Sequence, residues 1–62
     1  MNKLKEVREA KKMSQEKLAE LSGISRQTIC KLEADPKLNV TVDTISKLAE
    51  ALAVKFEDIF LP

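Results

Sequence analysis

The stretch from Ser14 to Glu33, SQEKLAELSGISRQTICKLE, constrains the fold of this chain more than any other part. It carries the signals of two short helices joined by a tight corner. Ser14 and Ser25 stand where helix N-caps are expected, since each hydroxyl can accept a backbone N–H of the first turn. Gly23 stands where the first helix must end, because glycine takes the positive φ of a helix C-terminus without a clash. We expect helices over residues 15–22 and 26–33.

The second of these helices has two chemically different sides. Its apolar side consists of Ile24, Ile29 and Leu32, and its polar side of Arg26, Gln27 and Lys31. Ala19 lies where the two helices would cross, and its small side chain lets the backbones approach. Cationic and amide side chains on a helix that is held by its neighbour are what reading of the DNA major groove requires. The stretch is therefore a candidate helix-turn-helix DNA reader.

The rest of the sequence predicts three further helices and no strand, so we expect one all-α domain over residues 1–62. Apolar residues recur at helical spacing in each segment. In the three further helices they are Leu4, Val7 and Ala10 in residues 2–12; Ile45, Leu48, Ala49 and Leu52 after a Thr41 N-cap; and Phe56, Ile59 and Phe60 in residues 56–60. In the helix over residues 15–22, Leu18, Ala19 and Leu21 are the apolar residues that we expect to be buried. The longest loop is 34–40, where Asp35-Pro36 marks a helix stop.

Composition excludes several classes of function. The 62 residues include no histidine, and they show no Gly-rich phosphate loop and no metal-ligand spacing, so we expect no enzyme, no cofactor and no metal. A single cysteine cannot form an internal disulfide, and no apolar run is long enough to span a membrane. An intracellular, cytoplasmic protein is expected. The net charge is +1, with a basic segment 1–12 and an acidic segment 41–62. These segments predict either a basic face opposite an acidic one or an ordinary solvated surface.

With these residues in place, the chain resembles the Cro/CI-type helix-turn-helix family, also called the Xre family, over roughly residues 3–61. The matching pieces are LKEVREAKKMSQEKLAELSGISRQTICKLE, TVDTISKLAEALAV and FEDIF. The resemblance implies a compact five-helix, lambda-repressor-like DNA-binding domain with its motif at 14–33. Three features depart from the family pattern. Asp35 stands where glycine is frequent, the loop to Thr41 is about one residue longer, and Ala53 replaces a glycine, which predicts a strained or differently built corner.

The resemblance also implies roles for individual residues. It places base contacts at Arg26, Gln27, Thr28 and Lys31, phosphate contacts at Gln15, Ser25, Lys37 and Asn39, and a structural ion pair between Arg8 and Glu33. In addition to its phosphate contact, Gln15 is expected to brace Gln27. The alternatives are generic polar surface residues, a solvated Gln15 in the first turn, and a Ser25 that is only a cap. Lysines 3, 5, 11 and 12 are expected to be ordinary solvated charges. For Cys30 we expect a small, partly buried filler, in preference to a redox or metal switch.

Family members of this length commonly bind DNA as two-fold dimers with half-sites roughly 34 Å apart. We therefore expect a homodimer on double-stranded DNA, joined through Phe56, Phe60 and Leu61 with help from the loop 38–40. The leading function is a sequence-specific transcriptional regulator, a repressor, associated with the nucleoid. The alternatives are a restriction–modification controller, an antitoxin, or a protein-interaction module that reads no DNA. No sensor domain follows Pro62, so control by concentration or by a partner is expected in place of a small ligand.

Overall fold

The computed structural model describes residues 2–35 and 37–60 of the chain. This part forms α1 (Leu4–Ala10), α2 (Gln15–Ser22), α3 (Arg26–Ala34), α4 (Val42–Leu52) and α5 (Phe56–Ile59). Its only β-type pairing is a single bridge between Asn2 and Phe60. The prediction of an all-α fold is confirmed. None of the helices in the described ranges is long and apolar enough to cross a membrane.

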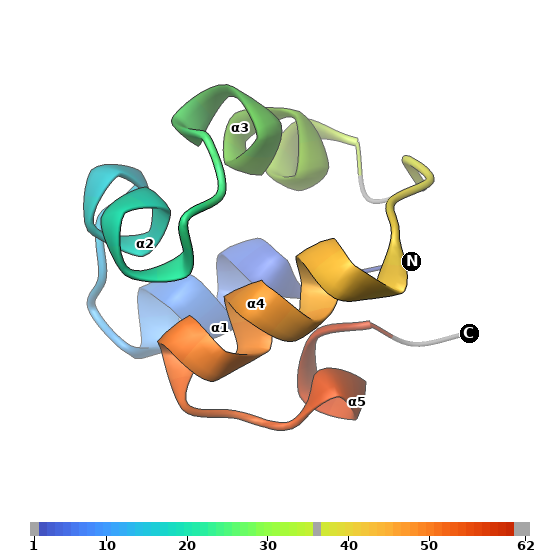
Figure 1. Ribbon diagram of the computed structural model, residues 1–62. Helices are drawn as coiled ribbons and strands as arrows, with labels where there is room; N and C mark the ends of the chain where they lie inside the picture. The colour runs from blue at the N-terminus through green and yellow to red at the C-terminus, as the bar shows by residue number, and fades with distance from the viewer. Residues whose placement is uncertain (1, 36, 61–62) are drawn as a thin grey trace.

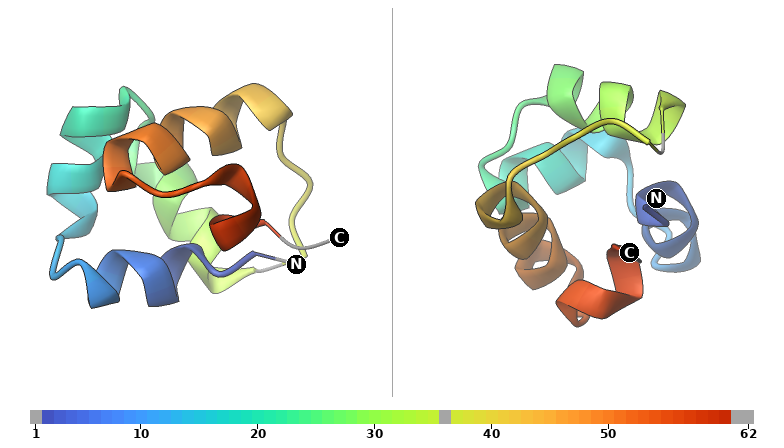
Figure 2. Two further views of the ribbon diagram at one scale, coloured as in Figure 1. Left: turned by 90° about the horizontal axis from the view of Figure 1, so that it is seen from below. Right: turned by 90° about the vertical axis from the view of Figure 1, so that its right-hand side faces the viewer.

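Helix α4 lies at the front of the molecule in Figure 1. It packs against α2 on one side and against α5 on the other, while α3 packs on α2. Helix α1 closes the structure by contacting both α3 and α5, as the turned views show (Figure 2). The basic amino-terminal segment and the acidic carboxy-terminal segment therefore meet where α1 packs on α5.

The core collects apolar side chains from all of these helices. The side chains that are almost completely buried are Leu4, Leu18, Ile29, Leu32, Ile45, Leu48, Ala49, Leu52 and Ile59. The apolar repeat predicted for α4 is thus confirmed in full. Leu21 is 50% exposed, although we predicted it to be buried. Ala10 is also exposed. Both lie at the edge of an apolar stripe, and helical spacing does not tell how wide a stripe the neighbouring helices cover.

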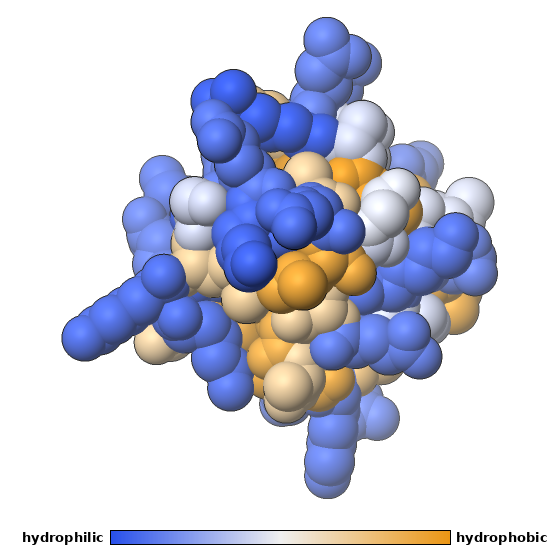
Figure 3. Space-filling view, turned by 60° about the vertical axis from the view of Figure 1, so that its left-hand side comes forward, coloured by the Kyte–Doolittle hydropathy of each residue, from blue (hydrophilic) through white to orange (hydrophobic). Residues whose placement is uncertain are grey.

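The side of the molecule on which α2 comes forward shows an apolar area ringed by hydrophilic side chains (Figure 3). The half-exposed Leu21 belongs to α2. The apolar side chains are therefore not completely covered on this side of the molecule.

The predicted helix starts are confirmed by their hydrogen bonds. The hydroxyl of Ser14 accepts from the backbone N–H of Lys17 at 3.0 Å. Ser25 accepts from Thr28 in the same way at 3.2 Å, and Thr41 caps α4 with the same geometry. These caps satisfy backbone donors that the first turn leaves without a partner.

Two helix ends adopt the left-handed conformation. Gly23 ends α2 at φ 75°, as predicted, and Ala53 ends α4 at φ 58°. An alanine in this region pays a steric cost of roughly 1–2 kcal/mol that glycine avoids. The predicted strain at the Ala53 corner is therefore present. Lys12, just after α1, also has a positive φ of 56°, which the sequence did not indicate. Asp35 is extended at φ −128°, so the missing glycine causes no strain there.

Helix α1 is shorter at both ends than the predicted range 2–12, and at its start Asn2 and Lys3 are used for pairing. The backbone N–H of Lys3 donates to the carbonyl of Ile59 at 2.6 Å. The side-chain oxygen of Asn2 accepts from the N–H of Leu4, and its amide donates to the carbonyl of Leu32 at 3.2 Å. Asn2 thereby joins the start of the chain to α3 and α5. The Pro36 part of the predicted helix stop lies outside the described residues; α3 ends at Ala34.

Candidate nucleic-acid interface

Helix α3 has a buried inner side and an exposed outer side. Ile29 and Leu32 on the inner side have no exposed surface. The exposed residues of the outer side are Arg26, Gln27, Cys30, Lys31 and Ala34. They follow the spacing i, i+1, i+4, i+5 and i+8, which places them along one continuous face of a helix. The outer side therefore presents two cations and an amide on a helix whose opposite side is fixed in the core.

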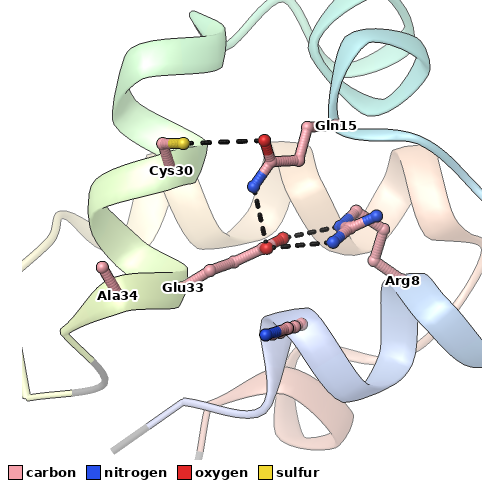
Figure 4. A pocket seen from close by; sticks show the side chains of 6 residues that line it. Arg8, Gln15, Cys30, Glu33 and Ala34 are labelled. Carbon is pink, nitrogen blue, oxygen red and sulfur yellow. Dashed lines mark hydrogen bonds and ion pairs between the residues drawn. The ribbon is translucent and has the colours of Figure 1, made fainter.

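An ion pair holds the end of α3 against α1 (Figure 4). Arg8 Nε lies 2.7 Å from Glu33 Oε2, and Arg8 Nη2 lies 3.0 Å from Glu33 Oε1. The predicted pair between Arg8 and Glu33 is thus present as a two-pronged contact, the geometry for which a guanidinium is suited. Arg8 also donates through Nη1 to the carbonyl of Met13 at 2.7 Å. One arginine therefore ties α1, the α1–α2 connection and α3 together.

The ion pair shifts the protonation of both partners. Burial raises the pKa of Glu33, but hydrogen bonds from Arg8 and Gln15 lower it by more, so its pKa lies below the ordinary value. The hydrogen bond that Arg8 donates to Glu33 raises the pKa of Arg8 above its ordinary value, although burial acts in the opposite direction. Both side chains are almost fully covered, with 12% of Arg8 and 5% of Glu33 exposed. The pair is charged at neutral pH and little screened by solvent.

Gln15 joins this pair to the outer side of α3. Its amide nitrogen donates to Glu33 Oε1 at 3.0 Å, and its carbonyl oxygen lies 3.5 Å from the sulfur of Cys30 (Figure 4). The amide thus spans Glu33 and Cys30, and within the described chain its hydrogen bonds are to these two residues and not to Gln27. Cys30 is exposed, not a partly buried filler, because it lies on the outer side, one turn after Arg26.

An open hollow of about 440 Å³ lies between α1, the start of α2 and the outer side of α3. Its lining residues are Lys5, Arg8, Gln15, Cys30, Glu33 and Ala34. The charges of Arg8 and Glu33 cancel in their pair, which leaves the ammonium of Lys5 as the uncompensated charge of the lining. The hollow is continuous with the exposed side of α3 because Cys30 and Ala34 belong to both. It is a concave, singly positive site suited to one anionic group.

Comparison with known proteins identifies the motif. The model of the helix-turn-helix family matches residues 4–59. This chain belongs to the helix-turn-helix family of the Cro/CI (Xre) type. An uncharacterised HTH-type transcriptional regulator of Methanocaldococcus jannaschii is 43% identical over 97% of this chain and 89% of its own length.

Two relatives come from Bacillus subtilis, and both are also described as uncharacterised HTH-type transcriptional regulators. YgzD is 39% identical over 95% of this chain and 88% of its own length. RghRB is 41% identical over 90% of this chain but only 40% of its own length. The matches to the M. jannaschii regulator and to YgzD cover nearly the whole of this chain and of each relative.

In this helix-turn-helix protein the remaining predicted DNA contacts have different environments. Thr28 is half-buried, and its hydroxyl lies 2.9 Å from that of Ser25, which also caps α3. Lys37 and Asn39 are exposed in the loop after α3. The backbone N–H of Lys37 donates to the side chain of Asp35 at 3.1 Å. Ser25 is therefore a cap at the least, while the side chains of the two loop residues face solvent.

The residues predicted to form a dimer contact are mostly packed into their own molecule. Phe56 and Phe60 are half-buried, and their ring centroids lie 5.9 Å apart with the rings tilted by 57°. Leu61 lies outside the described residues. Val42, which the sequence did not single out, is 69% exposed, and Leu38 is 37% exposed. Val42 lies three residues before Ile45, in phase with the apolar repeat of α4, so helical spacing does not indicate that it is exposed.

Sequence reasoning also missed an acidic residue at the interface. Glu16 Oε1, in the first turn of α2, lies 3.7 Å from Nη1 of Arg26 at the start of α3. Helical spacing does not reveal such a pair, because its partners belong to different helices. Only the angle between α2 and α3 brings them together.

Proposed function

We propose that this protein is a sequence-specific DNA-binding transcriptional regulator that places α3 in the major groove. The observation that supports this most strongly is the outer side of α3, where Arg26, Gln27 and Lys31 are exposed on a helix with a fully buried inner side. Arginine or lysine can donate to O6 and N7 of guanine, and glutamine can pair with N6 and N7 of adenine. Thr28 borders these residues as a lesser base contact. The names of the relatives support the same function.

In this proposal the DNA backbone runs past the start of α2 and across the hollow beside it. Gln15 opens α2, where free N–H groups and the helix dipole favour an anion. One N–H of its amide is used by Glu33, and the second is available for a phosphate. Lys5 lines the same hollow and is the cation that a phosphate there would meet. Ser25, Lys37 and Asn39 are further candidates for phosphate contacts.

The protein acts as a homodimer on a two-fold operator, and it represses transcription by occupying DNA that other proteins need. One domain of 62 residues covers a single half-site, and two-fold dimers place equivalent helices roughly 34 Å apart. The proposed contact combines the outer parts of Phe56 and Phe60, with Leu61, and the exposed side chains of Leu38 and Val42. A monomeric mass at micromolar concentration in analytical ultracentrifugation would contradict the dimer without touching DNA reading.

Selection of bound fragments from random duplex DNA tests the function. We expect enrichment of one motif, repeated with two-fold symmetry at half-site centres about one helical turn apart. Binding to that motif should weaken linearly on a plot of log K against log salt, because phosphate contacts release counterions. Absence of any enriched sequence would reject the proposal in favour of a protein-interaction module of the same fold.

Restriction–modification controllers and antitoxins share the proposed DNA-reading surface, so selection alone does not separate them from a simple repressor. Pull-down of the tagged protein with its own operator present and absent distinguishes an antitoxin from a simple repressor. An antitoxin retains a protein partner in both conditions, whereas a simple repressor retains only DNA.

A further inference from the structure

The DNA-reading side of this protein carries a carboxylate where cations are expected. Glu16 Oε1 lies 3.7 Å from Nη1 of Arg26, across the corner between α2 and α3. Both side chains are mostly exposed, 77% of Glu16 and 61% of Arg26. A pair so exposed to solvent contributes little to folding. The pair instead changes the local charge of the exposed surface, because the carboxylate of Glu16 lies beside the guanidinium of Arg26.

We propose that Glu16 is a specificity-determining residue of the DNA-binding surface and acts through Arg26. The inference rests on the proposed function, in which Arg26 reads a base. A solitary arginine on this surface can neutralise any phosphate, which adds affinity without discrimination. Glu16 makes that use of Arg26 unfavourable, because a phosphate bound by Arg26 would stand next to a second anion.

A guanine edge is compatible with Glu16, whereas a phosphate is not. Guanine offers two uncharged acceptors, O6 and N7. A guanidinium has five N–H donors in a planar fork, enough to serve guanine with one edge and Glu16 with another. Glu16 also restricts the directions in which Arg26 can point, so less freedom is lost when the base contact forms. The carboxylate therefore weakens non-specific binding more than it weakens specific binding. Its repulsion of phosphate increases the preference of the protein for its operator over other DNA.

Substitution Glu16→Gln tests this inference, with the operator found by selection and a scrambled duplex of equal length as probes. We expect affinity for the scrambled duplex to rise roughly two- to fivefold, the range of an exposed charge pair. Affinity for the operator rises less, so the ratio of the two dissociation constants falls. The salt dependence on the scrambled duplex becomes steeper by up to about 0.9, since Arg26 is released for one more phosphate.

Two variants separate action through Arg26 from a general effect of charge. Glu20→Gln removes the same charge one turn later on α2, from another exposed position, and should shift both duplexes equally. In an Arg26→Gln background, Glu16→Gln should no longer change the ratio. Thermal melting verifies that each variant folds.

The inference is overturned if Glu16→Gln leaves the ratio unchanged, if Glu20→Gln lowers it as much, or if the effect persists without Arg26. Selection of no sequence by the wild-type protein rejects the proposed function and, with it, this inference. Selection of an operator by the wild type with an unchanged ratio in Glu16→Gln rejects this inference alone.

Discussion

The two sides of α3 differ in what they contribute to the molecule. The inner side carries Ile29 and Leu32, which are fully buried, and it ends in Glu33, which is held by Arg8 and Gln15. The outer side carries Arg26, Gln27, Cys30 and Lys31, which are exposed and make few contacts within the described chain. One helix of nine residues therefore separates the residues that fix its position from those proposed to read DNA.

This separation means that the outer side can vary without loss of the fold. Residues that make no buried contact change stability by no more than about 0.5 kcal/mol when substituted. Residues of the inner side have no such freedom, because a chain of 62 residues has a total stability of only roughly 3–9 kcal/mol. The comparison predicts opposite consequences for similar substitutions on the two sides.

The largest effect is expected for Arg8→Met, which leaves the almost fully covered carboxylate of Glu33 without its cation. We expect a loss of about 3 kcal/mol of unfolding free energy, the lower end for breaking a covered ion pair. Urea denaturation measures it, with Arg26→Met on the outer side as the matched control that changes little. The double variant Arg8→Met with Glu33→Gln should recover much of the loss. Equal losses in Arg8→Met and Arg26→Met would contradict the separation of the two sides.

Acidification should remove a part of the same stabilisation. Because the folded pKa of Glu33 is lower than its ordinary value of 4.5, the ionised carboxylate stabilises the folded state. That contribution is complete above the unfolded pKa and is lost as the pH falls through the folded pKa. Denaturation midpoints of wild type should therefore decline below about pH 4.5 more steeply than those of Glu33→Gln. Parallel declines would show that other carboxylates dominate.

Two glutamine substitutions test the same division of roles with smaller expected changes in stability. Gln15→Ala loses a hydrogen bond to the charged Glu33 and should cost about 1–2 kcal/mol of stability. Gln27→Ala should leave stability within about 0.5 kcal/mol but remove about 1–3 kcal/mol of discrimination at one base pair. Thermal melting and binding to single-base operator variants measure the two quantities. A stability loss for Gln27→Ala as large as that for Gln15→Ala would count against our division of α3.

The smallest effect is expected for Cys30→Ala. The thiol makes one weak contact, 3.5 Å from the oxygen of Gln15, and is otherwise exposed. Stability should change by less than about 0.5 kcal/mol in thermal melting. Ile29→Val is the matched control on the inner side, because removing one buried methyl group typically lowers the unfolding free energy by about 0.5–1.5 kcal/mol. A larger loss for Cys30→Ala would mean that the outer side also holds the fold together.

Local chemistry made much of the fold predictable. Ser14, Ser25 and Thr41 each bond to a backbone N–H three residues away, so their capping role depends on a short piece of sequence. Gly23 is recognisable for the same reason. The fold of α4 was predictable because its apolar repeat is long and regular.

The features that were missed depend on distant parts of the chain. The exposure of Leu21 and Cys30 is decided by which helices reach the edge of a stripe, and the sequence does not specify this. The interaction of Asn2 with Leu32 spans thirty residues. The interaction of Glu16 with Arg26 depends on the angle between two helices. The candidate site was therefore predictable as a list of outward residues and one ion pair, Arg8–Glu33, but not as the whole network.

The pairing of Asn2 with Phe60, and of Lys3 with Ile59, brings the beginning and the end of the described chain side by side. The two ends of the described backbone thus lie close together. The packing of the helices therefore does not depend on which helix comes first in the chain. A circular permutant joined between these ends by a short linker and opened at the exposed Leu38–Asn39 bond should keep the same core. It would begin with α4 and finish with α3, so that the proposed reading helix would stand at the end of the polypeptide.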